Sequence, residues 1–532
     1  MQDFLKNNLK ILSHRSPYLY SLVENIQNDK KYSVGQSKSG KATLLGIFPD
    51  GSKKTLHSKY DPIKEAEQLI ETVYSKEKTN YILIGLGLGY HLNSLHERIS
   101  SQDRVIIFEK NPFLFRLALS QNNFSDVLKN QKVSWHIDIN PNQIEKILSE
   151  DRAIIAIHGF TPIILKPLID LDNDYYNLIS AEIEQVYQKF KIDIDTKAAF
   201  SQKFYANIFA NARDILESPG ILSLENIFSN IPVVVVSAGP SLDKNIGLIR
   251  SARKRIIVLT VATALKPLLR NGIEPDIVIA IDPNDETIQS FSIEKIPERL
   301  WLVFDPCIPP EINNFFKSQK IMLENRIELA RWITDHSEQK GVLENTSSVA
   351  HSAFHLAVHM GCNPIILVGQ DLSFEGHRMH CTDSFYNQSH KDNIGTDTTL
   401  DILEYRKYRG YNPSMTSSET IFNNRTKTTK AMDTYKYEFK KGINPKNITL
   451  NATEGGVNIP GAINISLREA LNKFCQEKKG FNANERFSKI DKPKYNNKLL
   501  ISINKQLEKL NTVEEKIKKI ADQYLLNNKI SE

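Results

Sequence analysis

The chain has 532 residues, of which 40% are hydrophobic and 24% charged, close to the averages of soluble globular proteins. At roughly 100–200 residues per domain, this length predicts about three or four domains with substantial cores, and it excludes a collagen-like, disulfide-framework or wholly disordered chain. The 68 Lys and Arg against 62 Asp and Glu give a net charge of +6, which is too small by itself to predict a nucleic-acid or membrane partner.

The N-terminal part of the chain divides into a polar segment and a region of alternating strands and helices. Residues 1–75 are rich in Lys and Asn with scattered helical periodicity, and we assign them to an N-terminal mixed segment. Apolar strands are then predicted at 81–89, 104–110, 133–138 and 153–159, with helices between them. This alternation is typical of a parallel α/β sheet, so we expect a Rossmann-like domain over 76–195 whose last part is helical.

A second α/β alternation begins at residue 231 and defines a central domain over 196–465. Residues 373–425 between its last strands are polar and irregular, which is typical of a lid or binding loop. The chain is helical beyond, and we assign 466–532 to a C-terminal helical domain. The predicted strands of the central domain lie at 231–242, 255–262, 276–282, 300–305, 320–325, 364–372 and within 446–461.

The chain has no feature that indicates export or a membrane span. Its four cysteines are far apart, and none belongs to a CxxC pair, which is typical of free thiols in a reducing compartment. The N-terminus lacks a signal-peptide pattern, and no stretch approaches about 18 uncharged apolar residues. We therefore expect a cytoplasmic protein.

Three motifs resemble known binding sites. The sequence around two of them argues against binding, and for the third it leaves the question open. GQSKSGKAT (35–43) nearly spells a P-loop, but no apolar strand precedes it and no clear helix follows. His351, His355 and His359 share a helix face, yet the outer pair is about 12 Å apart by helix rise, too far to share one ion easily. GLGLG (85–89) with Glu109 fits either a nucleotide-binding turn or glycines that only allow close packing.

Two strand-to-helix turns of the central domain are suited to bind anions. VVVVSAGPSLDKN (233–245) ends a buried strand at a glycine turn, with Ser241 at the start of a helix. In NTSSVAHSAFHLAVHMGCNPIILVGQDLSF (345–374), hydroxyl residues precede a helix, and Gly369 and Asp371 follow the next strand. Free amides at a helix start attract phosphate, and parallel sheets bind ligands at the carboxyl ends of strands. The two turns predict a nucleotide-linked substrate.

These turns also carry a resemblance to a known family. GPSL and the TSS turn are similar to bacterial sialyltransferases whose donor is a CMP-linked nonulosonic acid. The ordered set VVVVSAGPSL, IVIAIDPND, TSSVAHSAFHLAVHMGCNPIILVGQDLSF and TEGGVNIPGA resembles the motility accessory factor (Maf) family of flagellin glycosyltransferases. The resemblance covers about 195–470 well and 80–200 loosely. It departs from the sialyltransferases at Ala238, where they carry Asn, and at Ser348, where their TSG has glycine.

The resemblance implies an α/β fold with a Rossmann-like, sialyltransferase-like central domain, a smaller Rossmann-like N-terminal domain and a helical C-terminal region. It implies inverting transfer of pseudaminic or legionaminic acid, or a relative, from its CMP donor to Ser or Thr hydroxyls of flagellin, with no separate cofactor. This transfer supports flagellum assembly and motility. Carried over by position, the donor site comprises Gly239, Pro240 and Ser241, the phosphate- or carboxylate-holding Thr346, Ser347 and Ser348, and Gly369 and Asp371 beside the nucleotide.

The reaction requires a base for the acceptor hydroxyl and support for the leaving phosphate. The polar loop after Asp371 offers His377, His380, Tyr386 and His390. His380 is the favoured base because it matches the histidine after GQDL in the Maf pattern and because a histidine pKa lies near neutrality. Tyr386 is expected to donate to the phosphate, and His377 is a further candidate; a solvated loop histidine is the alternative reading.

Asp282 and Asp285 follow another strand, where paired carboxylates of other transferases hold Mg²⁺ or Mn²⁺. The resembled chemistry does without metal, so we predict no metal and assign Asp282 to a donor or acceptor contact. Two other functions stay open: a diphosphokinase of the archaeal pterin type, which shares a related motif set, and a non-catalytic flagellin-binding factor.

Overall fold

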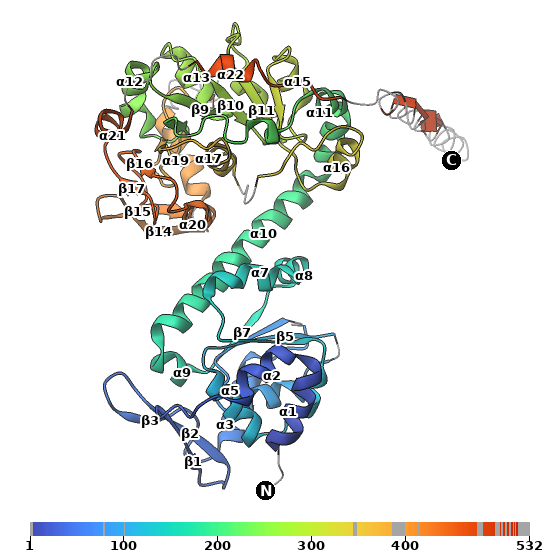
Figure 1. Cartoon of the computed structure of the whole chain (residues 1–532), viewed down its shortest axis with the longest axis vertical. Helices are drawn as coiled ribbons and strands as arrows, with labels where there is room; N and C mark the ends of the chain where they lie inside the picture. Colours follow the sequence, from blue (N-terminus) through green and yellow to red (C-terminus); the bar gives the residue numbers. More distant parts are fainter. Residues whose placement is uncertain are drawn as a thin grey trace, which may run out of the picture. The chain divides into compact units, whose positions relative to one another are not determined.

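A boundary inside one long helix divides the chain. The computed structural model shows two compact units, Met1–Thr196 and Lys197–Glu532, and the boundary falls within the 38-residue helix α10 (Asn173–Ala210) (Figure 1). The structure describes residues 4–77, 80–100, 102–343, 348–385, 400–411, 414–475 and 482–494, with 499, 501, 504–505, 508–509, 512–513, 515–516 and 518–519.

The first unit begins with two helices and a small antiparallel sheet. Ser16 and Asp61 cap the helices α2 and α3, each of which has proline at its start. The near P-loop at 35–43 includes the turn between antiparallel strands β1 and β2, so it has no strand–loop–helix context. These elements are α1 (Phe4–Arg15), α2 (Pro17–Glu24), β1 (Tyr32–Gln36), β2 (Ala42–Ile47), β3 (Lys53–Thr55) and α3 (Pro62–Val73).

The main sheet of the first unit is parallel, with the order β6-β5-β4-β7. Its strands are β4 (Asn80–Ile84), β5 (Arg104–Glu109), β6 (Val133–Ile137) and β7 (Thr161–Ile164). Between and after them lie α4 (Tyr90–His96), α5 (Pro112–Gln121), α6 (Ser125–Lys129), α7 (Ile144–Ser149), α8 (Arg152–His158) and α9 (Lys166–Leu171). The predicted Rossmann-like arrangement of this region is therefore present.

One predicted strand of this unit is wrong. Residues 153–159 form helix α8, and the fourth strand follows it as β7. A short apolar run does not distinguish a strand from a helix by periodicity alone. Here Ile155 and Ala156 are buried while Ile157 is 64% exposed, and Gly159, with φ +67°, ends the helix.

The second unit is built on an eight-stranded, wholly parallel sheet with the order β12-β11-β10-β9-β8-β13-β16-β17. The four valines of β8 are all buried, as expected for a parallel strand covered on both faces. Each of the seven strands predicted for the central domain contains one observed strand of this sheet, and β17 (Ile463–Asn464) was not predicted. The seven observed strands are β8 (Val233–Val236), β9 (Ile257–Val261), β10 (Ile277–Ala280), β11 (Trp301–Phe304), β12 (Lys320–Met322), β13 (Ile365–Val368) and β16 (Thr449–Asn451).

Helices cover both faces of this sheet (Figure 1). The chain winds in one direction from β8 to β12, with α12 (Leu242–Ala252), α13 (Ala262–Arg270), α14 (Ile288–Phe291) and α15 (Pro310–Asn314) after successive strands. It then passes through α16 (Glu328–Thr334) and α17 (Val349–His359) to β13 on the other side of β8. Because such crossovers are right-handed, α17 covers the face opposite to α12 and α13.

The polar segment 373–425 holds regular structure that its composition did not predict. Helix α19 (Leu400–Gly410) and the antiparallel hairpin of β14 (Met415–Glu419) and β15 (Arg425–Thr429) lie in or at the end of it, and α20 (Lys430–Gly442) follows. Beyond residue 466 come α21 (Leu467–Phe474) and α22 (Ala483–Phe487). In the part of the chain that the structure describes, no helix has the length and apolar character required to cross a bilayer.

Candidate functional site

The two predicted turns meet at one place in the sheet. Strands β8 and β13 are neighbours, and the winding direction of the chain reverses between them. In open parallel sheets, ligands bind at the carboxyl ends of strands at such a reversal point. The GPSL turn follows β8 and the GQD turn follows β13, so both turns lie at this point.

Hydrogen bonds join the two turns directly. The amide of Gly239 donates to the carbonyl of Gly369 at 2.9 Å, and Ser237 Oγ donates to Gln370 Oε1 at 2.7 Å. Ser241 Oγ donates to Asp371 Oδ2 at 2.8 Å, and the Ser241 amide approaches the same oxygen at 3.3 Å. The structure therefore brings together four of the predicted donor-site residues: Gly239, Ser241, Gly369 and Asp371.

Glycine is required where the turns surround Asp371. A Cβ at Gly239 would lie 2.0 Å from Asp371 Oδ2, and one at Gly456 would lie 2.2 Å from the Asp371 carbonyl oxygen. Gly369 has φ +69°, and its Cβ would lie 2.1 Å from the carbonyl oxygen of Ser237. Gly456 belongs to the TEGG motif after β16, and a Cβ at the preceding Gly455 would lie 3.2 Å from Asp371 Oδ1, so a third motif reaches the same residue.

Asp371 is a buried acceptor. Its carboxylate is only 6% exposed, and burial raises its pKa from 3.8 to about 6, although the hydrogen bonds from Ser241 oppose the shift. Ser241 was expected to cap α12, but its hydroxyl donates to Asp371 and makes no capping hydrogen bond. The first turn of α12 thus has no side-chain cap, and the amides of Leu242, Asp243 and Lys244 donate to the carbonyls of residues 239–241.

Ser348 is the described part of the second anion-binding turn, because Thr346 and Ser347 lie outside the described residues. It caps α17 by accepting from the His351 amide at 3.4 Å, and its Oγ lies 2.8 Å from His351 Nδ1. His351 Nε2 lies 2.8 Å from the Tyr435 carbonyl oxygen. Since α17 leads into β13, its N-terminus points toward the carboxyl edge of the sheet.

The loop histidines differ in surroundings. Burial lowers the pKa of His380 to about 3, with a further contribution from nearby Lys407, although the ring keeps some exposed surface. His380 is therefore neutral at physiological pH, which a base requires, but it is a weak base by itself. His377 is exposed, with its ring 5.2 Å from that of Tyr405. Tyr386 and His390 lie outside the described residues.

Asp282 and Asp285 have different partners. Asp282 Oδ1 accepts from the Asn284 amide at 2.9 Å, and burial raises the Asp282 pKa above 3.8. Asp285 forms an ion pair with Lys203 at 2.7 Å. Among the described residues there is no group of three His, Cys, Asp or Glu arranged to hold a metal ion.

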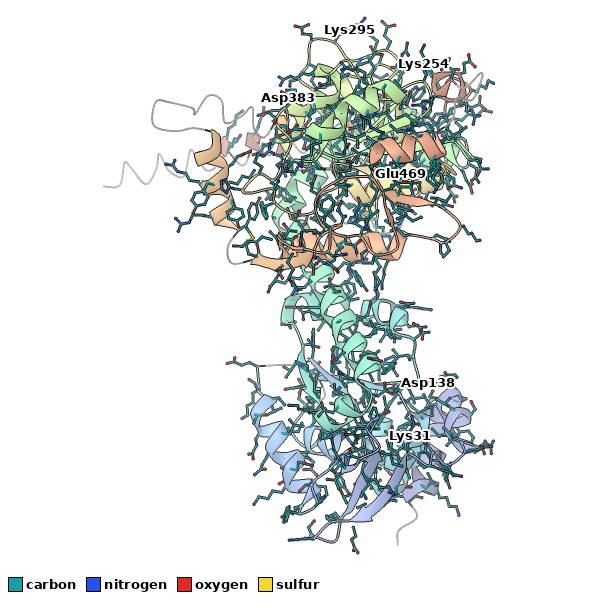
Figure 2. The ribbon with its side chains drawn as sticks, turned by 90° about the vertical axis from the view of Figure 1, so that its left-hand side faces the viewer. Lys31, Asp138, Lys254, Lys295, Asp383 and Glu469 are labelled. Carbon is teal, nitrogen blue, oxygen red and sulfur yellow. The ribbon has the colours of Figure 1, made fainter. Side chains whose placement is uncertain are left out.

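Ion pairs and hydrogen bonds hold the loop after Asp371 against α12 and α13, which sequence reasoning missed. Lys244 on α12 pairs with Glu375 at 2.8 Å, and Asp243 accepts from Thr382 Oγ1 at 2.7 Å. Asp383, labelled in Figure 2, pairs with Arg270 at 3.1 Å. Partners more than 100 residues apart leave no local signal in the sequence.

A cavity of about 640 Å³ lies between residues 220–227, 338–339 and 486–491, and none of the predicted site residues lines it.

The glycine turn of the first unit is closed by its own side chains. Glu109 Oε2 accepts from the Leu86 amide at 2.7 Å, and Glu109 Oε1 accepts from Tyr176 Oη at 2.8 Å. His57 Nε2 accepts from the Leu88 amide at 2.9 Å, and a Cβ at Gly87 would lie 2.6 Å from that nitrogen. The groups that a nucleotide would contact are engaged internally, which favours the close-packing interpretation.

Comparisons with known proteins agree with this architecture. Residues 31–151 match the family model described as "Glycosyltransferase Maf N-terminal domain", and residues 206–377 match "6-hydroxymethylpterin diphosphokinase MptE-like". The chain is similar to the solved MAf glycosyltransferase from Magnetospirillum magneticum AMB-1, with a TM-score of 0.59 and 15% identity over 92% of this chain and 78% of that one. No curated protein matches the chain.

Fold and site together define a two-unit α/β protein with an anion-suited crevice at a strand reversal point. The N-terminal residues match the model of the Maf N-terminal domain, and most of the chain shares the fold of the solved MAf glycosyltransferase.

Proposed function

We propose that this protein is a glycosyltransferase that moves a nonulosonic acid of the pseudaminic or legionaminic type from its CMP donor to Ser or Thr hydroxyls of flagellin. The observation that carries the proposal is the convergence of the GPSL, GQD and TEGG turns around Asp371 at the reversal point of the sheet. The match of residues 31–151 to the Maf N-terminal domain model supports glycosyl transfer, and the motif resemblance supports the donor and the acceptor.

The site can bind an anionic donor although the residues that the structure describes form no strongly basic surface there. The starts of α12 and α17 supply the positive ends of two helix dipoles, which favour a bound anion. Gly239 and Pro240 keep the backbone at the crevice bare of bulky side chains, while Ser348 and the neighbouring Thr346 and Ser347 add hydroxyl donors. In this proposal the phosphate and carboxylate of the donor lie between these two helix starts.

The reaction is a single displacement. The acceptor hydroxyl oxygen forms a bond to the anomeric carbon while the bond from that carbon to the CMP phosphate oxygen breaks, and its electron pair leaves with CMP. The hydroxyl proton passes to His380, which is neutral because its pKa is about 3. An anionic phosphate close to the ring raises that pKa, so bound donor strengthens the base. Tyr386 supports the leaving phosphate.

A diphosphokinase is the second candidate, and the match of residues 206–377 favours it. In that function the same amide-rich turns hold a nucleoside triphosphate, and a pterin hydroxyl attacks its β-phosphorus.

Intact mass of flagellin, after incubation with the purified chain and CMP-pseudaminic or CMP-legionaminic acid, tests the proposal. A gain of one or more nonulosonic acid residues is the expected result. A parallel reaction with ATP and a 6-hydroxymethylpterin tests the alternative through AMP release. Flagellin binding without a mass gain from either donor would instead indicate a binding factor. Full transfer by His380→Ala would remove His380 from the base role.

A further inference from the structure

Helix α19 carries an aromatic cluster beside the crevice. Its Tyr405 and Tyr408 rings stack with centroids 6.4 Å apart, and His377 from the loop after Asp371 lies 5.2 Å from Tyr405. The Phe374 ring packs edge-on against Tyr408, with the ring centroids 5.0 Å apart. Tyr405 is nevertheless 45% exposed, so the cluster has an open side.

Exposed cations border that open side. At about 100° per residue, Tyr405, Arg406 and Arg409 lie within one 100° sector of the helix. Arg406 and Arg409 are exposed, and neither forms an ion pair within the described part of the chain, whereas Glu404 is buried. We call Tyr405, Arg406, Arg409 and His377 the α19 face.

The helix lies close to the chemistry. Lys407 contributes to the lowered pKa of His380, and Glu286, which follows β10, acts on Lys407 in turn. These electrostatic effects require short separations. Lys407 lies about 160° around the helix from Tyr405 and Arg409, so these effects place the helix near His380. The α19 face itself contacts the loop after Asp371 through His377 and Tyr405.

We infer that the α19 face docks an acidic segment of the protein acceptor next to the hydroxyl that is modified. The inference rests on the proposed function, because it names how the acceptor of that reaction is held. Tyrosine and arginine are the residues that dominate protein interfaces, and arginine binds carboxylates through two parallel hydrogen bonds. With a net charge of only +6 over the whole chain, attraction of an acidic segment has to be local, and this face provides it.

Charge reversal tests the inference. The double variant Arg406→Glu/Arg409→Glu is compared with Lys254→Glu/Lys317→Glu, which changes charge equally at exposed positions of the same unit; Lys254 is labelled in Figure 2. We expect the KM for flagellin to rise about tenfold or more in the first variant only, with kcat and CMP affinity unchanged. Added salt should weaken wild-type binding and leave the reversed variant little affected.

Direct binding separates this inference from the proposed function. Serine peptides flanked by Glu or by Lys are titrated without donor, so binding is measured even if the wild type transfers nothing. Preference of the wild type for the Glu-flanked peptide, inverted in the reversed variant, supports docking. The inference is overturned if the reversed variant keeps the wild-type KM and peptide preference. It is also overturned if the Lys254/Lys317 control loses as much flagellin and peptide affinity as the reversed variant. Lower CMP-sugar affinity in Tyr405→Ala with unchanged peptide binding also overturns it, because the rings then hold the donor.

Discussion

Asp371 shows how a single residue organises the crevice at a cost in stability. Its carboxylate accepts from Ser241, lies against Gly239 and Gly455, and has little contact with water. No cation forms a direct ion pair with it in the described residues; Lys244 acts on it only weakly. A buried charge with a raised pKa is typical of functional sites, where stability is given up for chemistry or binding.

We predict that Asp371→Asn stabilises the protein and abolishes transfer. A pKa raised from 3.8 to about 6 disfavours the charged folded state, by an amount on the order of 2–3 kcal/mol at pH 7.5. Below about pH 4 the carboxyl is protonated in both the folded and the unfolded chain, so the penalty is absent; it grows as pH rises from about 4 to 6. Urea unfolding at pH 7.5 and 4.5 should show a gain in unfolding free energy that shrinks at the lower pH.

The exposed Asp335→Asn is the matched control and should change the free energy of unfolding by less than about 0.5 kcal/mol. A loss of stability in Asp371→Asn at pH 7.5 would show that the hydrogen bonds from Ser241 outweigh the burial of charge.

Gly239→Ala should remove transfer, whereas Gly247→Ala should not. The new Cβ at 239 would lie 2.0 Å from Asp371 Oδ2 and 2.5 Å from the Gly369 carbonyl oxygen, so one of the two turns must move. Gly247 lies within α12, and its Cβ would meet nothing within 4 Å, so alanine there should stabilise the helix by about 0.5–1 kcal/mol. Donor binding by calorimetry and Tm of both variants check this; retained CMP-sugar affinity in Gly239→Ala contradicts it.

At the scale of elements, the end of α10 supports the carboxyl edge of the second-unit sheet. Lys203 and Asn207 lie four residues apart on α10, and Asn211 follows directly after the end of the helix. Asn207 Nδ2 donates to the Cys307 carbonyl at 2.7 Å, and Asn211 Nδ2 donates to the carbonyls of Pro306 and Ile308 at 3.0 and 2.8 Å. This side of the helix thus fixes the loop after β11 and, through Lys203 and Asp285, the loop after β10.

Asn211→Leu should destabilise the protein by about 2–4 kcal/mol, because two buried carbonyls lose their donor and Asn313 loses its acceptor. Lys203→Ala should cost less than about 1 kcal/mol, since its ion pair with Asp285 is partly exposed and screened by water. Denaturant unfolding of both variants checks the ranking. An equal loss of unfolding free energy in the two variants would mean that this side of the helix stabilises the protein through charge and not through the amide hydrogen bonds.

The elements differ in how far their sequence predicts them. The strands of the second-unit sheet are runs of buried β-branched residues between glycine or proline turns, and this pattern identified seven of the eight. Helix α8, the β1–β3 sheet and the β14–β15 hairpin were missed or misassigned, because short or polar elements are defined by the surface against which they pack. The turns at 239–241 and 369–371 were predicted, but the Ser241–Asp371 bond joins residues 130 positions apart. Only the strand order places them together.

At the scale of the whole molecule, two units repeat one topology with opposite outcomes. Each has a parallel sheet whose winding reverses, between β4 and β7 in one and between β8 and β13 in the other, and each places a glycine turn at the reversal point. In the first unit Leu165, Leu168 and His57 meet the glycines, and Glu109 takes the turn amide. In the second unit no side chain caps the start of α12, although its first amides donate to backbone carbonyls of the turn.

We therefore predict that the chain binds one CMP and not two. Calorimetric titration of the full chain should give a stoichiometry near one, and Gly239→Ala should remove it. Glu109→Gln should leave CMP affinity unchanged, because Glu109 is fully buried and already engaged by Leu86 and Tyr176; its effect should be confined to a lower Tm, as one acceptor oxygen is lost. A stoichiometry near two, or loss of CMP binding in a folded Glu109→Gln variant, would show that the glycine turn of the first unit opens to admit a nucleotide. That opening would have to displace His57 and break the Glu109–Leu86 bond, so it would appear as faster amide exchange at residues 86–88 on adding CMP.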